Sequence, residues 1–125
     1  MRKLGYVRLF RDEAGESHFE GVDVVLDQAL HAPPAPPLDM ASLGAASGVA
    51  LIGGDSDWGG DVPHPAPVRQ FLVVLVGRAE ITASDGSSRQ FDPGDLVLIE
   101  DTSGKGHSTR ILTDPGVALV IRLPE

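Results

Sequence analysis

The chain has 125 residues, a length that fits one domain with its own hydrophobic core. Its formal net charge of −8 argues against nucleic acid or an anionic membrane as a partner, because both attract clustered Lys and Arg. The absence of Cys excludes disulfides, thiolate metal ligands and a cysteine nucleophile. Charged residues such as Arg8, Arg11 and Asp12 interrupt the N-terminus before an apolar signal sequence could form, and no apolar run could cross a bilayer. We therefore expect a cytoplasmic protein.

The first half of the chain indicates strands joined by turns. Two short apolar-rich runs, 6–10 and 19–26, flank the turn-forming segment 12–16 and predict a pair of strands. Segment 31–37 contains four prolines, which remove backbone donors and fix φ, so we expect an extended, polyproline-like connector on the surface. Residues 48–53 are a third strand candidate.

A long irregular stretch follows at residues 53–67, and loops of this length in compact domains are usually functional or disordered. Its acidic residues resemble the first half of a calcium-binding loop. However, Gly59 stands at the third acid position and the closing Glu would fall on Ala66, which excludes an EF-hand. Further on, Lys105 lies between glycines, but the spacing and the missing Ser or Thr exclude a phosphate-binding loop.

The second half of the chain has the clearest strand pattern. Residues 71–76 are continuously apolar, which predicts a strand covered on both faces. Turn signals at Asp85-Gly86, Pro93-Gly94 and Pro115-Gly116 separate the further strand candidates 96–99, 107–112 and 117–123. Eight to ten short strands predict an all-β barrel or sandwich. Period-two patterning assigns these residues to its core: Leu72, Val74, Val76, Ile99, Ile111, Leu119 and Ile121.

The same half resembles the metal-site motifs of the cupin family. The first family motif has two histidines one residue apart, then a Glu, then a Gly. Counting back from Gly77 places Gln70 at the Glu position, Ala66 at the second histidine and His64 at the first. The second motif has a Gly-Asp turn, a strand and a later His, and His107 occupies that last place. The chain thus resembles a small single-domain bacterial cupin with a degenerate metal motif.

The resemblance implies a double-stranded β-helix, or jelly-roll barrel, spanning residues 1–125. Residues 1–40 would supply N-terminal strands and the Pro-rich connector, and 48–125 the barrel core. It also implies a homodimer. The alternate residues Phe71, Val73 and Leu75 would form an apolar outer face, to be covered by the N-terminal strands of the same chain or by a second copy.

The motif residues predict a small-molecule pocket at the barrel mouth. His64, Ala66 and Gln70 share parity, so on one extended strand they would face the same side. His64, His107 and Gln70 are candidate ligands for a divalent transition metal such as Zn, Fe, Ni or Mn, although only the imidazoles are strong ligands. A carboxylate from Asp57, Asp61, Glu100 or Asp101 could complete the set. The alternative is a pocket without metal.

Two functions follow from this pocket. The first is an enzyme acting on a polar organic compound, with His64 and His107 as metal ligands or acid/base groups. The second is a non-catalytic protein that binds or senses a small ligand. Gln70, Trp58 and Asp101 are candidate ligand-binding residues in either case, with Trp58 as a lid or as a packing anchor. We also expect His107→Ala to leave stability nearly unchanged, because a strand end should lie outside the core.

Overall fold

The computed structural model describes residues 2–125, which form ten β-strands and no helix. The strands are β1 (Arg2–Arg11), β2 (Ser17–Ala29), β3 (Leu38–Met40), β4 (Gly48–Gly54), β5 (Gln70–Val76), β6 (Ala79–Ala83), β7 (Ser88–Phe91), β8 (Leu96–Ile99), β9 (His107–Ile111) and β10 (Gly116–Arg122). The expected all-β class is confirmed. A search of these residues for a helix of membrane-spanning length and hydropathy finds none.

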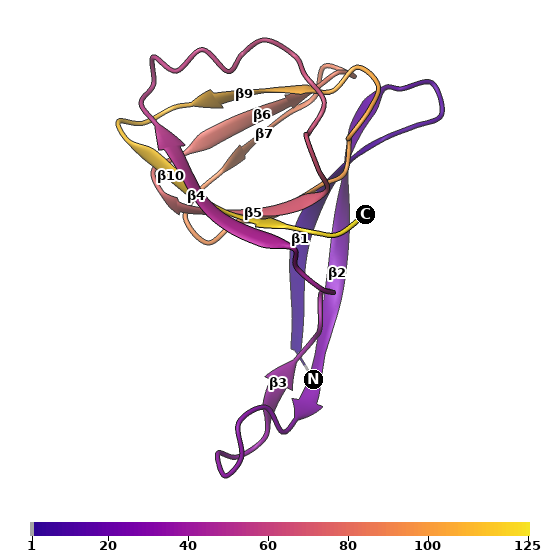
Figure 1. The fold of residues 1–125 in the computed structure, drawn as a ribbon, viewed down its shortest axis with the longest axis vertical. Helices are drawn as coiled ribbons and strands as arrows, with labels where there is room; N and C mark the ends of the chain where they lie inside the picture. The colour runs from indigo at the N-terminus through magenta and orange to yellow at the C-terminus, as the bar shows by residue number, and fades with distance from the viewer. Residues whose placement is uncertain (1) are drawn as a thin grey trace.

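The strands form two sheets that face one another (Figure 1). The larger sheet has seven strands in the order β3-β2-β1-β8-β5-β10-β4, and the smaller has three in the order β7-β6-β9. Among residues 2–125, β1 and β8 are the only neighbouring strands that pair in parallel. The hairpin of β1 and β2 extends well beyond the two facing sheets and carries β3 at its far end (Figure 1). We call this extension the arm, residues 2–6 and 22–40.

The N-terminal elements follow the sequence expectation except at the prolines. Both predicted strands are present and are longer than expected, with a turn between them. The Pro-rich segment is exposed, as expected, but the extended connector is wrong: Ala35 N donates to Ala32 O (2.9 Å), which closes a turn. Leu38–Met40 then pairs back along β2. Fixed proline φ angles suit a turn as well as a polyproline helix, so composition alone did not separate the two.

The predicted turns at Asp85-Gly86 and Pro93-Gly94 are confirmed, and at Pro115-Gly116 the chain bends directly into β10. Gly86 and Gly94 have φ values of 92° and 93°, the left-handed region that their turns require. Asp95 N donates to Asp92 O (2.9 Å), which closes the turn before β8.

The core lies between the two sheets, and the expected list is partly wrong. Val74 and Ile99 are buried there. Val76 is 47% exposed, and β10 buries Ala118 and Val120 in place of Leu119 and Ile121. Because almost every residue of β10 is apolar, hydropathy could not indicate which alternate set faces inward. The remaining buried members of this core cluster are Leu9, Ala66, Ile81, Ala83, Phe91 and Val97.

Candidate functional site

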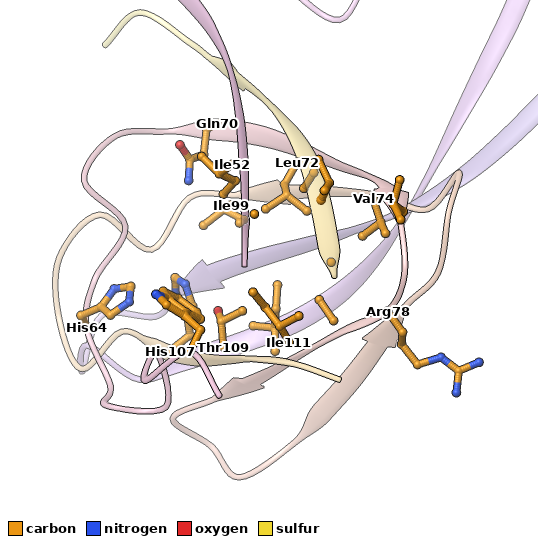
Figure 2. A pocket seen from close by; sticks show the side chains of 18 residues that line it. Ile52, His64, Gln70, Leu72, Val74, Arg78, Ile99, His107, Thr109 and Ile111 are labelled. Carbon is orange, nitrogen blue, oxygen red and sulfur yellow. The ribbon is translucent and has the colours of Figure 1, made fainter. Parts of the chain in front are cut away.

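A cavity of about 340 Å³ lies between the two sheets (Figure 2). Strands β4, β5, β8 and β10 line it from the large sheet, and β6 and β9 line it from the small one. Its lining includes His64, Gln70, His107 and Trp58, so the four residues that were expected to share one pocket do so. A cavity of this size suits a small organic molecule.

His64 and Gln70 reach the cavity by different routes, which corrects the expectation of a single strand. His64 lies in the irregular loop, where it makes an isolated β-bridge to His107: each backbone N–H donates to the other's carbonyl, at 2.9 and 3.0 Å. Gln70 begins β5 in the opposite sheet. Prolines on both sides of His64 remove neighbouring donors, so the ladder cannot continue as a regular strand. The two side chains converge only in the tertiary structure.

The strongest polar contact at the site joins Asp101 and His107. The ring Nδ1 of His107 donates to Asp101 Oδ2 at 2.6 Å. Asp101 is fully buried and His107 is 5% exposed. The second carboxylate oxygen, Oδ1, has no hydrogen-bond partner among residues 2–125. His107 begins β9 but is buried, so the premise that this strand end lies outside the core is wrong. We now expect removal of its side chain to lower stability.

Asp101 is hydrogen-bonded to His107 and does not itself line the cavity. Its carboxylate lies behind the ring and is absent from the cavity lining. The bond fixes Nδ1 as the protonated nitrogen of the neutral ring and leaves Nε2 for a molecule in the cavity. This arrangement is common for imidazoles that act as bases or bind metals. Sequence reasoning had Asp101 as a ligand-binding residue and missed its positioning role, because the pairing depends on a turn of the chain between the two residues.

The loop that leads to His107 is held in place by the N-terminal hairpin. Lys105 N donates to Gly15 O at 2.8 Å. The buried Ser17 hydroxyl donates to Gly106 O at 2.6 Å. In the structure this loop is a packed support for His107 rather than a free segment.

Trp58 forms part of the rim of the cavity. Its ring packs against Gly60, where an added Cβ would lie 1.9 Å from the ring. The side chain is 50% exposed and lines the cavity. Trp58 is thus a packing anchor for its own loop and, in the same position, a wall that a bound molecule would touch.

The acidic residues expected to complete a metal site do not line the cavity. Asp57 and Asp61 are exposed. Glu100 instead pairs with Arg8 and with Arg69, whose Nε lies 2.6 Å from Oε2. Burial alone would raise the pKa of Glu100, but hydrogen bonds from the two guanidinium groups outweigh it and hold that pKa below its usual range.

The two histidines outside the motifs, His18 and His31, do not line the cavity. His31 is exposed. His18 bridges two turns, with Nε2 at 2.7 Å from Asp12 and Nδ1 at 3.0 Å from Asp85. The hydrogen bond to Asp12, followed by that to Asp85, raises the pKa of His18.

Comparisons with known proteins give no independent assignment. No protein-family model matches the chain, and none of the curated proteins matches it significantly. Function must therefore be argued from the site.

Proposed function

We propose that this protein is a small enzyme that transfers a proton on an organic molecule held between its two sheets, with His107 as the acid/base group. The observation that supports this most is the buried pair of Asp101 and His107 at the cavity wall. Burying a carboxylate with one oxygen lacking a hydrogen-bond partner is costly, so such a group calls for an explanation beyond packing. Orientation of a catalytic imidazole supplies that explanation.

The proposed step is an isomerisation by proton transfer. His107 Nε2 accepts a proton from an acidic carbon of the substrate, and the bonding electrons stay on the substrate as an enolate. The resulting imidazolium is stabilised by the carboxylate of Asp101 behind it. Return of the same proton to a second carbon completes the reaction, so no oxidant or reductant is consumed. Gln70 lies at the cavity wall, where its amide N–H can donate to the enolate oxygen, and His64 can accept a hydrogen bond from the substrate.

We expect Asp101→Asn to reverse the tautomer of His107 and to slow proton transfer. An Asn amide would donate to Nδ1, which forces the proton of the neutral ring onto Nε2 and removes the base. The tautomer is read from the ¹⁵N NMR shifts of the imidazole. Proton transfer is read as deuterium exchange at the α-carbon of a probe ketone, 4-phenylbutan-2-one, and we expect a loss of about 100-fold.

Asp85→Asn is the matched control for this variant. It removes a carboxylate from Nδ1 of another histidine, His18, outside the cavity. Exchange should then stay at the wild-type rate. Exchange that is equally fast in wild-type and Asp101→Asn protein, or that wild-type protein does not accelerate, would refute the proposed activity.

The donor set does not fit a resident metal ion well. Among residues 2–125 no group of three or more His, Cys, Asp or Glu is placed to hold one. His64 and His107 are two imidazoles, and Gln70 adds only a neutral amide oxygen, so the charge of Zn, Fe, Ni or Mn would not be compensated. The acid/base form of the proposal therefore needs no cofactor.

A jelly-roll barrel of the cupin type is the proposed architecture, and the strand order supports it. The large sheet contains β4-β10-β5-β8 in consecutive order, and the small sheet has β9-β6-β7. The bridge from His64 to His107 adds a fourth position beside β9. Each of these two groups then has four positions. From β4 to β10 the chain crosses repeatedly from one group to the other, as in a double-stranded β-helix. A crystal structure would test this order.

The runner-up is a protein that binds or senses a small ligand without turnover. The same cavity would serve it, and Gln70 and Trp58 would then be recognition residues. Saturable binding of a ligand that stays unchanged, together with an inactive exchange assay, would favour this alternative.

We further propose that the protein works as a homodimer. The outer face of the large sheet buries Phe71 under Leu98 and Leu123 of the same chain. Val49 and Leu51 on β4 remain 65% and 67% exposed. In the described part of the chain β4 pairs on one side only, which leaves an open sheet edge.

The arm supplies the second surface of the proposed dimer. Its exposed apolar residues are Leu4, Val25, Leu30, Leu38 and Met40. A narrow ribbon extending into solvent is marginally stable unless its apolar surface is packed. A second copy would offer its own β4 to this arm and accept the reciprocal contact, which closes the pair about a two-fold axis.

Light scattering tests the dimer, with an expected mass twice the 13.1 kDa of one chain at micromolar concentration. Leu51→Glu should give monomers, because it places a charge in the apolar contact. Val62→Glu is the matched control, since Val62 is 68% exposed on the loop instead. A wild-type monomer, or two variants that behave alike, would contradict the proposal.

A further inference from the structure

The cavity has a polar end and an apolar body. In Figure 2 His64 and His107 lie next to one another and Gln70 lies across the cavity from them at the same end, whereas Leu72 and Val74 extend toward the other end along β5. The remaining apolar lining residues are Ile52, Val76, Ala79, Ile81, Ile99, Ile111, Val117 and Ala118. A molecule that fills the cavity therefore meets hydrogen-bonding groups at one end and aliphatic side chains over most of its surface.

Both imidazoles present an acceptor to the cavity. His107 uses Nδ1 to donate to Asp101, and His64 uses Nδ1 to donate to the carbonyl of Pro65 at 3.0 Å. The acceptors are a carboxylate and a carbonyl oxygen, so the proton of each neutral ring lies on Nδ1 and each Nε2 carries a lone pair. The rings lie close together, with centroids 5.2 Å apart. A bound group between them must donate a hydrogen bond to be satisfied.

Among the described residues that line the cavity, Arg78 carries the one fixed charge, and its guanidinium is directed out of the cavity. Asp101 lies behind His107. Arg78 is at the opposite end from His64 and points away from the cavity in Figure 2, where its Nε lies 2.7 Å from Asp92 Oδ1. Its charge is thus already paired outside the cavity. A multiply charged ligand would lose its hydration without gaining an ionic partner.

From these three observations we propose the substrate class: a neutral molecule with an apolar body and a single O–H donor at one end, such as a phenol or the enol form of a ketone. A cavity of about 340 Å³ has the volume of about ten water molecules, so the ligand is of similar heavy-atom count. For the reaction that such a molecule would undergo, the inference rests on the proposed function. The binding of the molecule does not depend on turnover.

Equilibrium binding to the wild-type protein tests the class, with Trp58 as the reporter. Trp58 is the single tryptophan of the chain and lies at the cavity rim, so its fluorescence reports occupancy. The probe is 4-propylphenol. We expect 4-propylanisole, which has the same body and no O–H, to bind about tenfold more weakly, because the imidazole acceptors would be left unsatisfied. The phosphate ester of 4-propylphenol should bind more weakly still.

Two variants of matched exposure test the apolar body. Val76→Asn should weaken the binding of 4-propylphenol several-fold, because Val76 lines the apolar part of the cavity. Leu43→Asn should not, since Leu43 lies outside the cavity and is 46% exposed, against 47% for Val76. The proposed class is overturned if 4-propylphenol does not bind, if the anisole or the phosphate binds as tightly, or if the two variants behave alike. Tight binding with an inactive exchange assay would refute the proposed reaction and leave the ligand class standing.

Discussion

Replacing His107 with alanine is expected to lower the free energy of unfolding by about 3 kcal/mol, because it leaves a buried carboxylate without its hydrogen-bond partner. Asp101 is fully buried, and its only side-chain hydrogen bond in the described chain is the one to His107. Small domains are stable by only about 5–15 kcal/mol, so the loss is a large share of the total. The melting temperature should fall by about 10 °C, measured by circular dichroism.

A double-mutant cycle separates this effect from ordinary side-chain truncation. If the two groups are coupled, Asp101→Ala/His107→Ala should cost less than the sum of the two single changes. His31→Ala truncates an exposed histidine and should leave the melting temperature unchanged. Additive single changes, or a stable His107→Ala protein, would show that the pair is not coupled and would weaken the case for an oriented base.

Gly106→Ala is expected to separate His64 from His107 and to abolish ligand binding. Gly106 has a φ of 75°, and a Cβ there would lie 2.2 Å from the carbonyl carbon of His64. The positive φ alone costs about 1–3 kcal/mol for a residue with a side chain. The contact is with backbone, so the bridge between the two histidines must open. Fluorescence titration with 4-propylphenol and thermal unfolding measure the two effects.

Gly86→Ala provides the matched control for the backbone strain. Gly86 also has a positive φ, 92°, but an added Cβ there meets no atom within 4 Å. Its loss of stability should be the smaller of the two, and its ligand affinity should equal that of the wild-type protein. If Gly106→Ala binds 4-propylphenol normally, the bridge is not needed to form the site.

Local sequence signals predicted most of the strands because their causes are local. Gly86 and Gly94 mark turns through their positive φ, and the apolar run of β5 marks a strand, although its last two residues are exposed. These features depend on a few adjacent residues, so hydropathy and turn chemistry suffice to find them. The prolines at 33 and 34 show the limit: proline fixes φ and removes a donor, yet it did not distinguish a turn from an extended connector.

The sequence predicted part of the candidate site, and the tertiary structure determined the rest. Motif spacing selected His64, Gln70 and His107, and all three line one cavity. The spacing placed His64 and Gln70 on one strand, whereas they enter from opposite sheets. Only the packed chain puts Asp101 behind His107, because that pairing depends on a loop held by the distant N-terminal hairpin.

By itself the sequence determined the all-β class, the positions of most turns and four of the residues that line the cavity, which are His64, Gln70, His107 and Trp58. The tertiary structure decided which face of β10 is buried. The strand is apolar on both faces, so its hydropathy pattern does not distinguish them. It also decided the role of His107. Whether an imidazole is a surface group or an oriented base depends on its burial and on its partner, and contacts between segments distant in the chain set both.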